Sequence, residues 1–220
     1  MATIPLVRQP EPVRALSWQA VAFTERIVAA LMLALAAPVV LTSGLVLSLF
    51  SRRSPLIAHK RVGWLGAPLW VLKLRTMWDG AAGREQRTAR WIEQIDDEVG
   101  PDLKEAGDPR VANAFARFCR RHSIDEIPQL WHVVTGQMSL VGPRPMTAAE
   151  LRRYYGPDAD EILQVKPGLA GLWQVSGRNR LNYAQRRALD LQLVRTRSVR
   201  MYLSLLLRTI PEVLGGANSW

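Results

Sequence analysis

The sequence predicts an α+β protein that is mostly helical, with one long apolar N-terminal helix followed by a small domain. Three observations predict this class. Residues 27–50 contain no charged side chain, residues 56–77 have the pattern of a short antiparallel hairpin, and the later apolar residues recur with helical spacing. A chain of 220 residues is long enough for one compact domain. We therefore divide it into a segment 1–21, a helix 22–50 and a domain 51–220.

The composition is that of a folded, basic chain. It carries 29 Lys and Arg against 19 Asp and Glu, a net charge of +10, and 48% of its residues are apolar. One cysteine, Cys119, excludes an internal disulfide framework. The positive charge suits nucleic acid, an anionic membrane surface or a phosphorylated substrate. Residues 79–126 hold eleven acidic and eight basic side chains, which argues against a general nucleic-acid binder.

The uncharged run 27–50 predicts a membrane helix. Its 24 residues would extend roughly 36 Å, against about 30 Å for the hydrocarbon core of a bilayer. Pro38 cannot donate to the carbonyl of Ala34, so we expect a kink there. Basic residues lie on both sides of the run, including Arg26 and Arg52. A re-entrant hairpin and a kinked spanning helix are both compatible with these flanks.

The elements of the domain follow from its periodicity and its turn residues. Strands at 56–62 and 68–77 flank a Gly-Trp-Leu-Gly turn and predict a hairpin. The segments with helical composition or period are 84–98, 111–121, 147–155 and 183–194. In 111–121 the expected apolar face consists of Val111, Ala114, Phe115 and Phe118. Gly and Pro mark rigid breaks at 142–145 and 166–168.

The segment 197–210 predicts an amphipathic interfacial helix. Its polar arc holds Arg197, Arg200, Ser204 and Arg208, and its apolar arc holds Tyr202, Leu203, Leu206, Leu207 and Ile210. Packing of the apolar arc on the domain core is the alternative. Eight tryptophans in the chain favour the interface, because Trp is enriched at headgroup depth.

Asp125 and Glu126 are the leading candidates for chemistry. They precede an apolar helical run and follow Arg120 and Arg121. Helix capping is one interpretation, with either Ser123 or Asp125 as the N-cap residue. Ionised carboxylates at a helix N-terminus can also bind Mg²⁺ or act as nucleophiles. The local sequence leaves both interpretations open.

Basic residues beside Gly and Pro breaks are candidates for an anion site. Lys73 and Arg75 end the second predicted strand, Arg144 lies in a Gly-Pro-Arg-Pro turn, and Arg178 lies in Gly-Arg-Asn. No P-loop, GxGxxG, HExxH or paired-cysteine metal motif is present. His59, His122 and His132 have unrelated spacings, which argues against a zinc site.

Four motifs, taken in order, resemble one family. They are Lys73-Leu-Arg-Thr-Met77, the segment Arg120 to Leu130 with its Ser-x-Asp-Glu-Ile-Pro-Gln-Leu, Met138-Ser-Leu-Val-Gly-Pro-Arg-Pro145, and Lys166-Pro-Gly-Leu-Ala-Gly-Leu-Trp-Gln-Val-Ser-Gly-Arg-Asn179. Over about 22–216 the chain resembles the bacterial sugar transferases, which are membrane-associated polyprenyl-phosphate phosphoglycosyl transferases.

The resemblance implies a reaction and the residues that perform it. An enzyme of this kind moves a phosphosugar from a nucleotide diphosphate sugar, here expected to be a UDP-sugar, to undecaprenyl phosphate and releases UMP. Asp125 would be the nucleophile that forms a covalent phosphosugar intermediate, and Glu126 would assist, with Mg²⁺ bound at the pair. The residues that the resemblance suggests for substrate binding are Lys73, Arg120, Arg144, Gln174, Arg178 and Asp190.

The family also implies a location. Its members hold the N-terminal helix as a re-entrant hairpin broken at Ser-Pro, where this chain has Ala37-Pro38. We therefore expect a monotopic protein in the inner (plasma) membrane, in contact with membrane lipid, with its domain on the cytoplasmic face. Its product would begin an exopolysaccharide, capsule, O-antigen or other glycan. The alternative is a basic membrane-tethered protein without catalytic activity that binds anionic lipid or nucleic acid.

Overall fold

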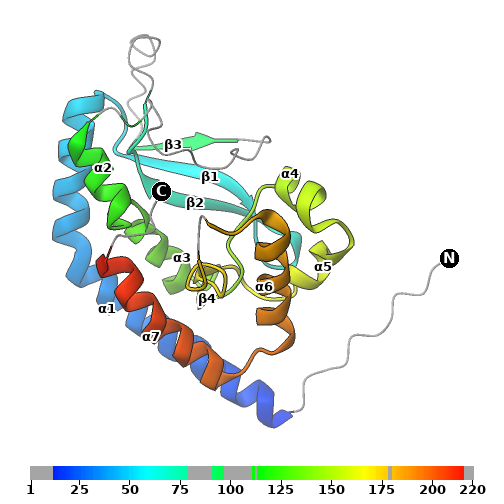
Figure 1. Cartoon of the computed structure of the whole chain (residues 1–220). Coiled ribbons are helices and arrows are strands. Elements are labelled where there is room, and N and C mark those ends of the chain that lie inside the picture. The colour runs from blue at the N-terminus through cyan, green and yellow to red at the C-terminus, as the bar shows by residue number, and fades with distance from the viewer. Residues whose placement is uncertain (1–11, 79–90, 97–110, 112, 178–179, 216–220) are drawn as a thin grey trace.

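A computed structural model of the chain describes residues 12–78, 91–96, 111, 113–177 and 180–215 (Figure 1). The α-helices are α1 (Pro12–Ser51), α2 (Ala114–Arg121), α3 (Leu130–Val134), α4 (Ala148–Glu150), α5 (Ala159–Ile162), α6 (Tyr183–Arg195) and α7 (Val199–Gly215). The short helices are the 3-10 turns η1 (Trp64–Gly66), η2 (Ile124–Gln129) and η4 (Gly156–Asp158) and the π-helix η3 (Leu151–Tyr155). The prediction of a mostly helical α+β protein is confirmed.

Two small sheets complete the domain. The predicted hairpin is confirmed, because β1 (Leu56–Val62) pairs antiparallel with β2 (Pro68–Leu74). On its other edge β1 pairs in parallel with β3 (Ile92–Ile95), so the sheet is mixed, with the order β2-β1-β3. The second sheet pairs β4 (Ser139–Val141) in parallel with β5 (Gly168–Ala170).

Three sequence-based expectations are corrected by these elements. The predicted helix 84–98 is wrong at 92–95, where the alternating residues of β3 pair with β1, and its other residues lie largely outside the described part. The apolar face predicted for 111–121 is wrong at Ala114 and Phe118, which are exposed, whereas Val111 and Phe115 belong to the core as predicted. Helix α2 also buries Ala116 and Cys119. The break expected at 166–168 leads directly into β5 at Gly168.

Helix α1 packs one face along the domain. Its buried or half-buried positions recur about every 3.6 residues and include Glu25, Ala29, Leu33, Ser43 and Leu47. It contacts α2, α3, η2, β2, β4 and α7. The opposite face is apolar and open to the surroundings, and Leu35 is 84% exposed. This helix is long and apolar enough to cross a membrane by length and composition, from Trp18 to Ser51.

Pro38 lies inside α1 without ending it. The ribbon changes direction between its dark-blue and light-blue parts (Figure 1), as expected where a proline removes a backbone hydrogen bond. Thr42 Oγ1 donates to the carbonyl oxygens of Pro38 at 2.7 Å and Val39 at 3.2 Å. The Thr42 hydroxyl therefore donates to carbonyl oxygens of α1 at the bend.

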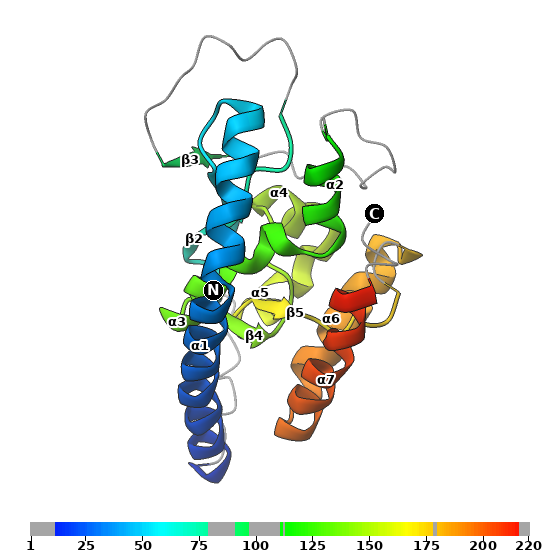
Figure 2. The same ribbon diagram turned by 90° about the vertical axis from the view of Figure 1, so that its left-hand side faces the viewer.

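Helix α7 contacts the first half of α1 near the start of α7, where the Trp18 and Tyr202 ring centroids lie 6.2 Å apart. Figure 2 shows the two helices set apart over the rest of α7. Its apolar residues divide between two faces. Tyr202 and Leu205 are buried in the core, whereas Leu203, Leu207 and Ile210 are more than half exposed. The amphipathic helix predicted at 197–210 is confirmed, but its apolar arc is wrong at Tyr202, which packs inward.

Candidate active site

The helix η2 positions Asp125 and Glu126 in its first turn. The chain enters it through Ser123, which has left-handed backbone angles (φ 54°, ψ 23°) and whose side chain makes no capping bond. Glu126 N donates instead to the carbonyl oxygen of Ser123 at 3.0 Å. Ser123 is thus the N-cap residue of η2 by position, but the capping box predicted between Ser123 and Glu126 is not formed.

Two cations from distant parts of the sequence meet at Glu126. Its Oε1 accepts from Lys73 Nζ at 2.9 Å and from Arg144 Nη2 at 3.1 Å. Glu126 raises the pKa of Arg144, against the effect of burial, and Glu150 and Asp125 raise it further. All three side chains of this triad are about 20–30% exposed. The group can therefore be reached by a ligand, and its cations are held by a carboxylate.

Close contacts hold the two chain segments from which Lys73 and Arg144 extend. Lys73 extends from β2, whose Leu72 N donates to Nε2 of the buried His132 at 3.1 Å. Arg144 follows β4, which lies so close to β5 that a Cβ on Gly168 would lie 2.0 Å from Gly142 N. Larger side chains at these two glycines would separate the strands and displace the turn that carries Arg144.

Asp125 is buried in the part of the domain that packs on α1. Asp125 is 7% exposed, and the helix η2 that carries it packs on α1. Burial raises the pKa of the Cys119 thiol to about 11, with a further contribution from the negative charge of Asp125, while a hydrogen bond with Ser43 of α1 acts in the opposite direction. Asp125 therefore lies near Cys119, which itself contacts α1 just beyond the kink.

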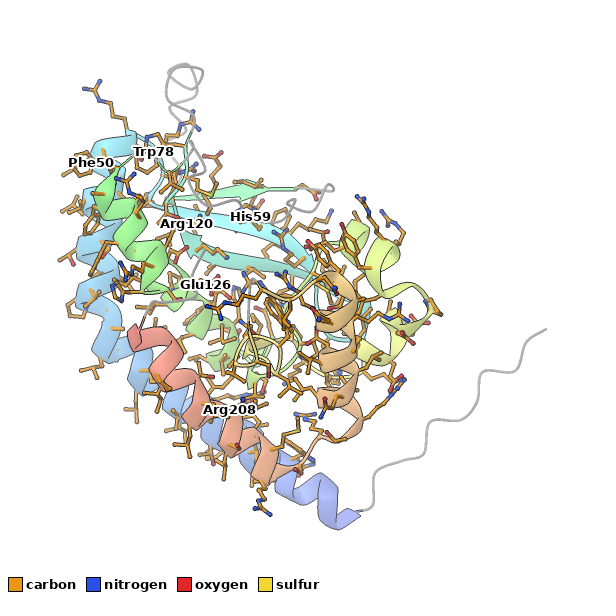
Figure 3. The ribbon with its side chains drawn as sticks, viewed as in Figure 1. Phe50, His59, Trp78, Arg120, Glu126 and Arg208 are labelled. Carbon is orange, nitrogen blue, oxygen red and sulfur yellow. The ribbon has the colours of Figure 1, made fainter. Side chains whose placement is uncertain are left out.

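Arg120 lies in α2, which packs on η2. Its guanidinium Nε is buried and has no hydrogen-bond partner among the described residues. Figure 3 shows Arg120 and Glu126 on these neighbouring elements, below the β1–β2 hairpin. A buried donor without a partner costs free energy. Arg120 is therefore suited to an anionic ligand at Asp125 and Glu126, which we call the dyad.

Gln174 and Asp190 are placed differently from this group. Gln174 Nε2 donates to Leu169 O at 3.0 Å, and its Oε1 is buried without a partner among the described residues. Asp190 is fully buried in α6 and accepts a hydrogen bond from Tyr155 Oη at 2.7 Å. Gln174 and Asp190 are thus held by Leu169 and Tyr155, respectively. Arg178 lies outside the described residues.

The structure brings together Asp125, Glu126, Lys73 and Arg144, which the sequence pattern singled out. It separates Arg75 from them: Arg75 is buried and pairs with Glu93 of β3. Glu150, which the sequence analysis missed, raises the pKa of both Arg144 and Tyr155. Its charge therefore acts both on Arg144, beside Glu126, and on Tyr155, which pairs with Asp190. In the sequence only its capping-box spacing after Thr147 marks it.

The donor set at the dyad fits a hard divalent cation. Asp125 and Glu126 provide oxygen ligands, and Mg²⁺ in proteins commonly takes one or two carboxylates together with substrate phosphates and water. Among the described residues no group of three or more His, Cys, Asp or Glu side chains is arranged to hold a metal. A cation bound at this pair would therefore need ligands from a phosphate substrate.

This chain is similar to known proteins whose names include transferases and an exopolysaccharide production protein. The chain is 42% identical over 161 residues to a UDP-galactose-lipid carrier transferase of Erwinia amylovora, covering 73% of this chain and 33% of that protein. It is 38% identical over 203 residues to the UDP-glucose:undecaprenyl-phosphate glucose-1-phosphate transferase of Caulobacter vibrioides, covering 88% and 69%. It is 38% identical over 162 residues to the exopolysaccharide production protein ExoY of Rhizobium meliloti, covering 74% and 71%.

The match to the Erwinia protein spans only a third of that relative's length. The family match is broader, because the family model described as bacterial sugar transferase covers residues 17–216. That range includes α1 from residue 17 onward, Asp125 and Glu126 in η2, Lys73, Arg144 and helix α7. The chain therefore belongs to the bacterial sugar transferase family.

Proposed function

We propose that this protein transfers a phosphosugar from a UDP-sugar to undecaprenyl phosphate and releases UMP. The observation that carries the proposal is the dyad: a buried Asp125 beside Glu126, which is held by Lys73 and Arg144. The relatives support the substrate class, since their names include UDP-glucose, undecaprenyl phosphate and exopolysaccharide production. The product would accordingly begin an exopolysaccharide, capsule or related glycan.

In the proposed first step, an Oδ atom of Asp125 attacks the β-phosphorus of the nucleotide sugar. The bond from Oδ to phosphorus forms, and the bond from that phosphorus to the bridging oxygen breaks. The electron pair leaves with the α-phosphate as UMP. In the second step an oxygen of the lipid phosphate attacks the same phosphorus, and the bond to Asp125 breaks.

Lys73 and Arg144 supply positive charge for both steps. An anionic nucleophile and an anionic diphosphate repel each other, so catalysis needs cations fixed before the substrate arrives. Both side chains already converge on Glu126 Oε1, which reduces their reorganisation when a phosphate binds. The unpaired Nε of Arg120 would donate to a substrate oxygen.

Asp125 and Glu126 would hold Mg²⁺ together with the diphosphate, as their oxygen donors suit this ion. Mg²⁺ bound there would offset the charge of the diphosphate and of the departing UMP. Glu126 would keep its place through its ion pairs with Lys73 and Arg144.

The packing of α1 supports a re-entrant, monotopic attachment. Its inward face contacts the domain from Trp18 to Leu47. If α1 crossed the bilayer, the domain packed along it would also enter the hydrocarbon core with its polar backbone loops, which is strongly unfavourable. A helix kinked at Pro38 that enters and leaves one leaflet avoids this, and both ends then lie on the cytoplasmic face of the inner membrane.

The experiment that tests the function omits the lipid acceptor. Purified full-length protein is incubated with a UDP-sugar and Mg²⁺, and we expect release of UMP together with a mass increase of one sugar phosphate on the intact protein. Asp125→Asn should show neither change. A panel of UDP-sugars that yields no adduct and no UMP, or an Asp125→Asn variant that still forms the adduct, would contradict the covalent mechanism.

A further inference from the structure

A second group of positive charges lies where α1, α7 and the segment before β5 meet. We call it the Glu25 cluster; it consists of Glu25 and Arg26 in α1, Lys166 before β5 and Arg197 before α7. Burial lowers the pKa of Lys166, the charge of Arg26 lowers it further, Glu25 raises it, and Arg197 again lowers it. Lys166 therefore lies within electrostatic reach of the other three charges, although the four come from three separate segments.

Glu25, the one acidic residue of the cluster, accepts hydrogen bonds from neutral groups. Glu25 Oε2 accepts from Tyr202 Oη at 2.6 Å, Ser139 Oγ at 2.7 Å and Leu140 N at 3.1 Å. Among the described residues no ion pair joins Glu25 to Arg26, Lys166 or Arg197. Three positive charges against one negative charge leave a net charge of +2, and both arginines are exposed.

The surroundings of these cations suit the boundary of a bilayer. The Arg197 guanidinium carbon lies 3.8 Å from the centroid of the Trp18 ring, and Trp is enriched at headgroup depth. Two residues before and after Glu25, on the outward face of α1, Phe23 is 68% exposed and Ile27 is 47% exposed. Leu203 of the neighbouring α7 is also exposed. Cations that border an open apolar surface are placed to meet lipid headgroups.

The Glu25 cluster is electrostatically separate from the dyad. The charges that raise the pKa of Arg144 are those of Glu126, Glu150 and Asp125, and none belongs to the cluster. The charges that act on Lys166 and Arg197 include no residue of the dyad. The charges that act most strongly on each group therefore belong to that group.

We propose that Arg26, Lys166 and Arg197 bind the phosphodiester headgroup of an anionic phospholipid. This goes beyond the proposed transfer reaction, because the phospholipid is not a substrate. Its acyl chains would lie along the exposed apolar residues of α1 and α7, and its phosphate would offset the net charge of +2. The bound lipid would join the membrane helix to α7 at the same place where Glu25 joins α1, β4 and α7 through hydrogen bonds.

Thermal unfolding of the full-length protein in neutral detergent tests this site. We expect dioctanoyl phosphatidylglycerol to raise Tm in a saturable manner, and dioctanoyl phosphatidylcholine to raise it much less, because a ligand that binds only the folded state stabilises it. The triple variant R26Q/K166Q/R197Q should need at least tenfold more phosphatidylglycerol for the same shift. The matched control R117Q/R152Q/R153Q removes three exposed arginines and should respond like the wild type.

Further arms identify the ligand. Equal shifts with both phospholipids, a response only to a short-chain polyprenyl phosphate or to inorganic phosphate, or an unchanged response of the triple variant would overturn the proposal. If the triple variant does not fold, R197Q alone should weaken the response, and R26K/R197K, which retains the charges, should keep it. Because the readout is lipid binding, these results are independent of whether UMP release is observed.

Discussion

Asp125 and Asp190 are both buried aspartates of the same domain, but their surroundings are opposite. Asp125 lies beside Glu126, near the cations Lys73 and Arg144 and in a part of the site that is partly open. Asp190 is fully buried with the Tyr155 hydroxyl as its hydrogen-bond donor, and its Oδ1 has no partner among the described residues. A carboxylate can act as a nucleophile only when it is ionised, and nearby cations favour the ionised form. The cations near Asp125, and not its burial, therefore distinguish it from Asp190 as a candidate for phosphoryl transfer.

The pKa of Asp190 expresses this difference. Burial raises it from 3.8 to about 7, whereas the hydrogen bond from Tyr155 and the charge of Arg186 act in the opposite direction. The pKa of Tyr155 is raised as well, first by burial and then by Asp190. At neutral pH the pair therefore keeps its protons more readily than exposed groups would.

The largest expected effect comes from exchanging the charge of the nucleophile. Asp125→Asn should reduce phosphosugar transfer by about 10³-fold or more, since removal of a covalent nucleophile leaves only binding and electrostatic effects. Asp190→Asn keeps an acceptor for the Tyr155 hydroxyl and should form the covalent intermediate. Transfer of radiolabelled sugar phosphate to undecaprenyl phosphate measures the loss. Equal losses in both variants, with both proteins folded, would remove the distinction between the two aspartates.

A smaller loss is expected when one cation of the dyad is removed. Arg144→Gln removes one ion pair of Glu126 and leaves its ion pair with Lys73. We expect the rate to fall by about 10²-fold, which is typical for a lost electrostatic contact to a transition state. Arg187→Gln is the matched control, because Arg187 of α6 pairs with Asp158 of η4 and not with Glu126. If the control loses as much activity as Arg144→Gln, overall charge and not the position of Arg144 is responsible.

Sequence reasoning located the dyad because its residues are contiguous, and located Lys73 and Arg144 because each adjoins a strand end or a rigid turn. It could not show that both cations meet on one oxygen of Glu126, since 53 and 18 residues separate them from it. Glu25 escaped notice for the same reason: its donors Ser139 and Tyr202 are 114 and 177 residues away. The strand β3 was missed because pairing with β1 outweighed the helical composition of the region.

The stability of the fold should depend on pH through Asp190. Its pKa is raised in the folded state, so between about 3.8 and about 7 the unfolded chain binds fewer protons than the folded chain. The free energy of unfolding should therefore fall as pH rises through this window and level off above it, by up to a few kcal/mol in the contribution of this group. Chemical denaturation in detergent at several pH values measures the slope.

Asp190→Asn should remove that contribution and flatten the slope. Asp160→Asn, which changes an exposed aspartate of α5, is the control and should keep the slope of the wild type. If the wild type and Asp190→Asn have the same slope, Asp190 is ionised in the fold, and its contrast with Asp125 disappears.

The smallest expected effect concerns the turn that leads into the dyad. Ser123 has a positive φ of 54° and its side chain makes no capping bond, so the residue is in a left-handed conformation that costs about 1 kcal/mol for a side chain with a Cβ. Ser123→Gly should therefore stabilise the protein by a few tenths of a kcal/mol to about 1 kcal/mol, reduced by the greater flexibility of glycine in the unfolded chain. Ser123→Ala retains the Cβ and should leave stability nearly unchanged. Asp125 follows Ser123 by two residues, so the Ser123→Gly variant should also be assayed for transfer. A gain in stability with full activity would show that the dyad does not need this strain. A gain in stability with slower transfer would show that the strained turn helps to position Asp125.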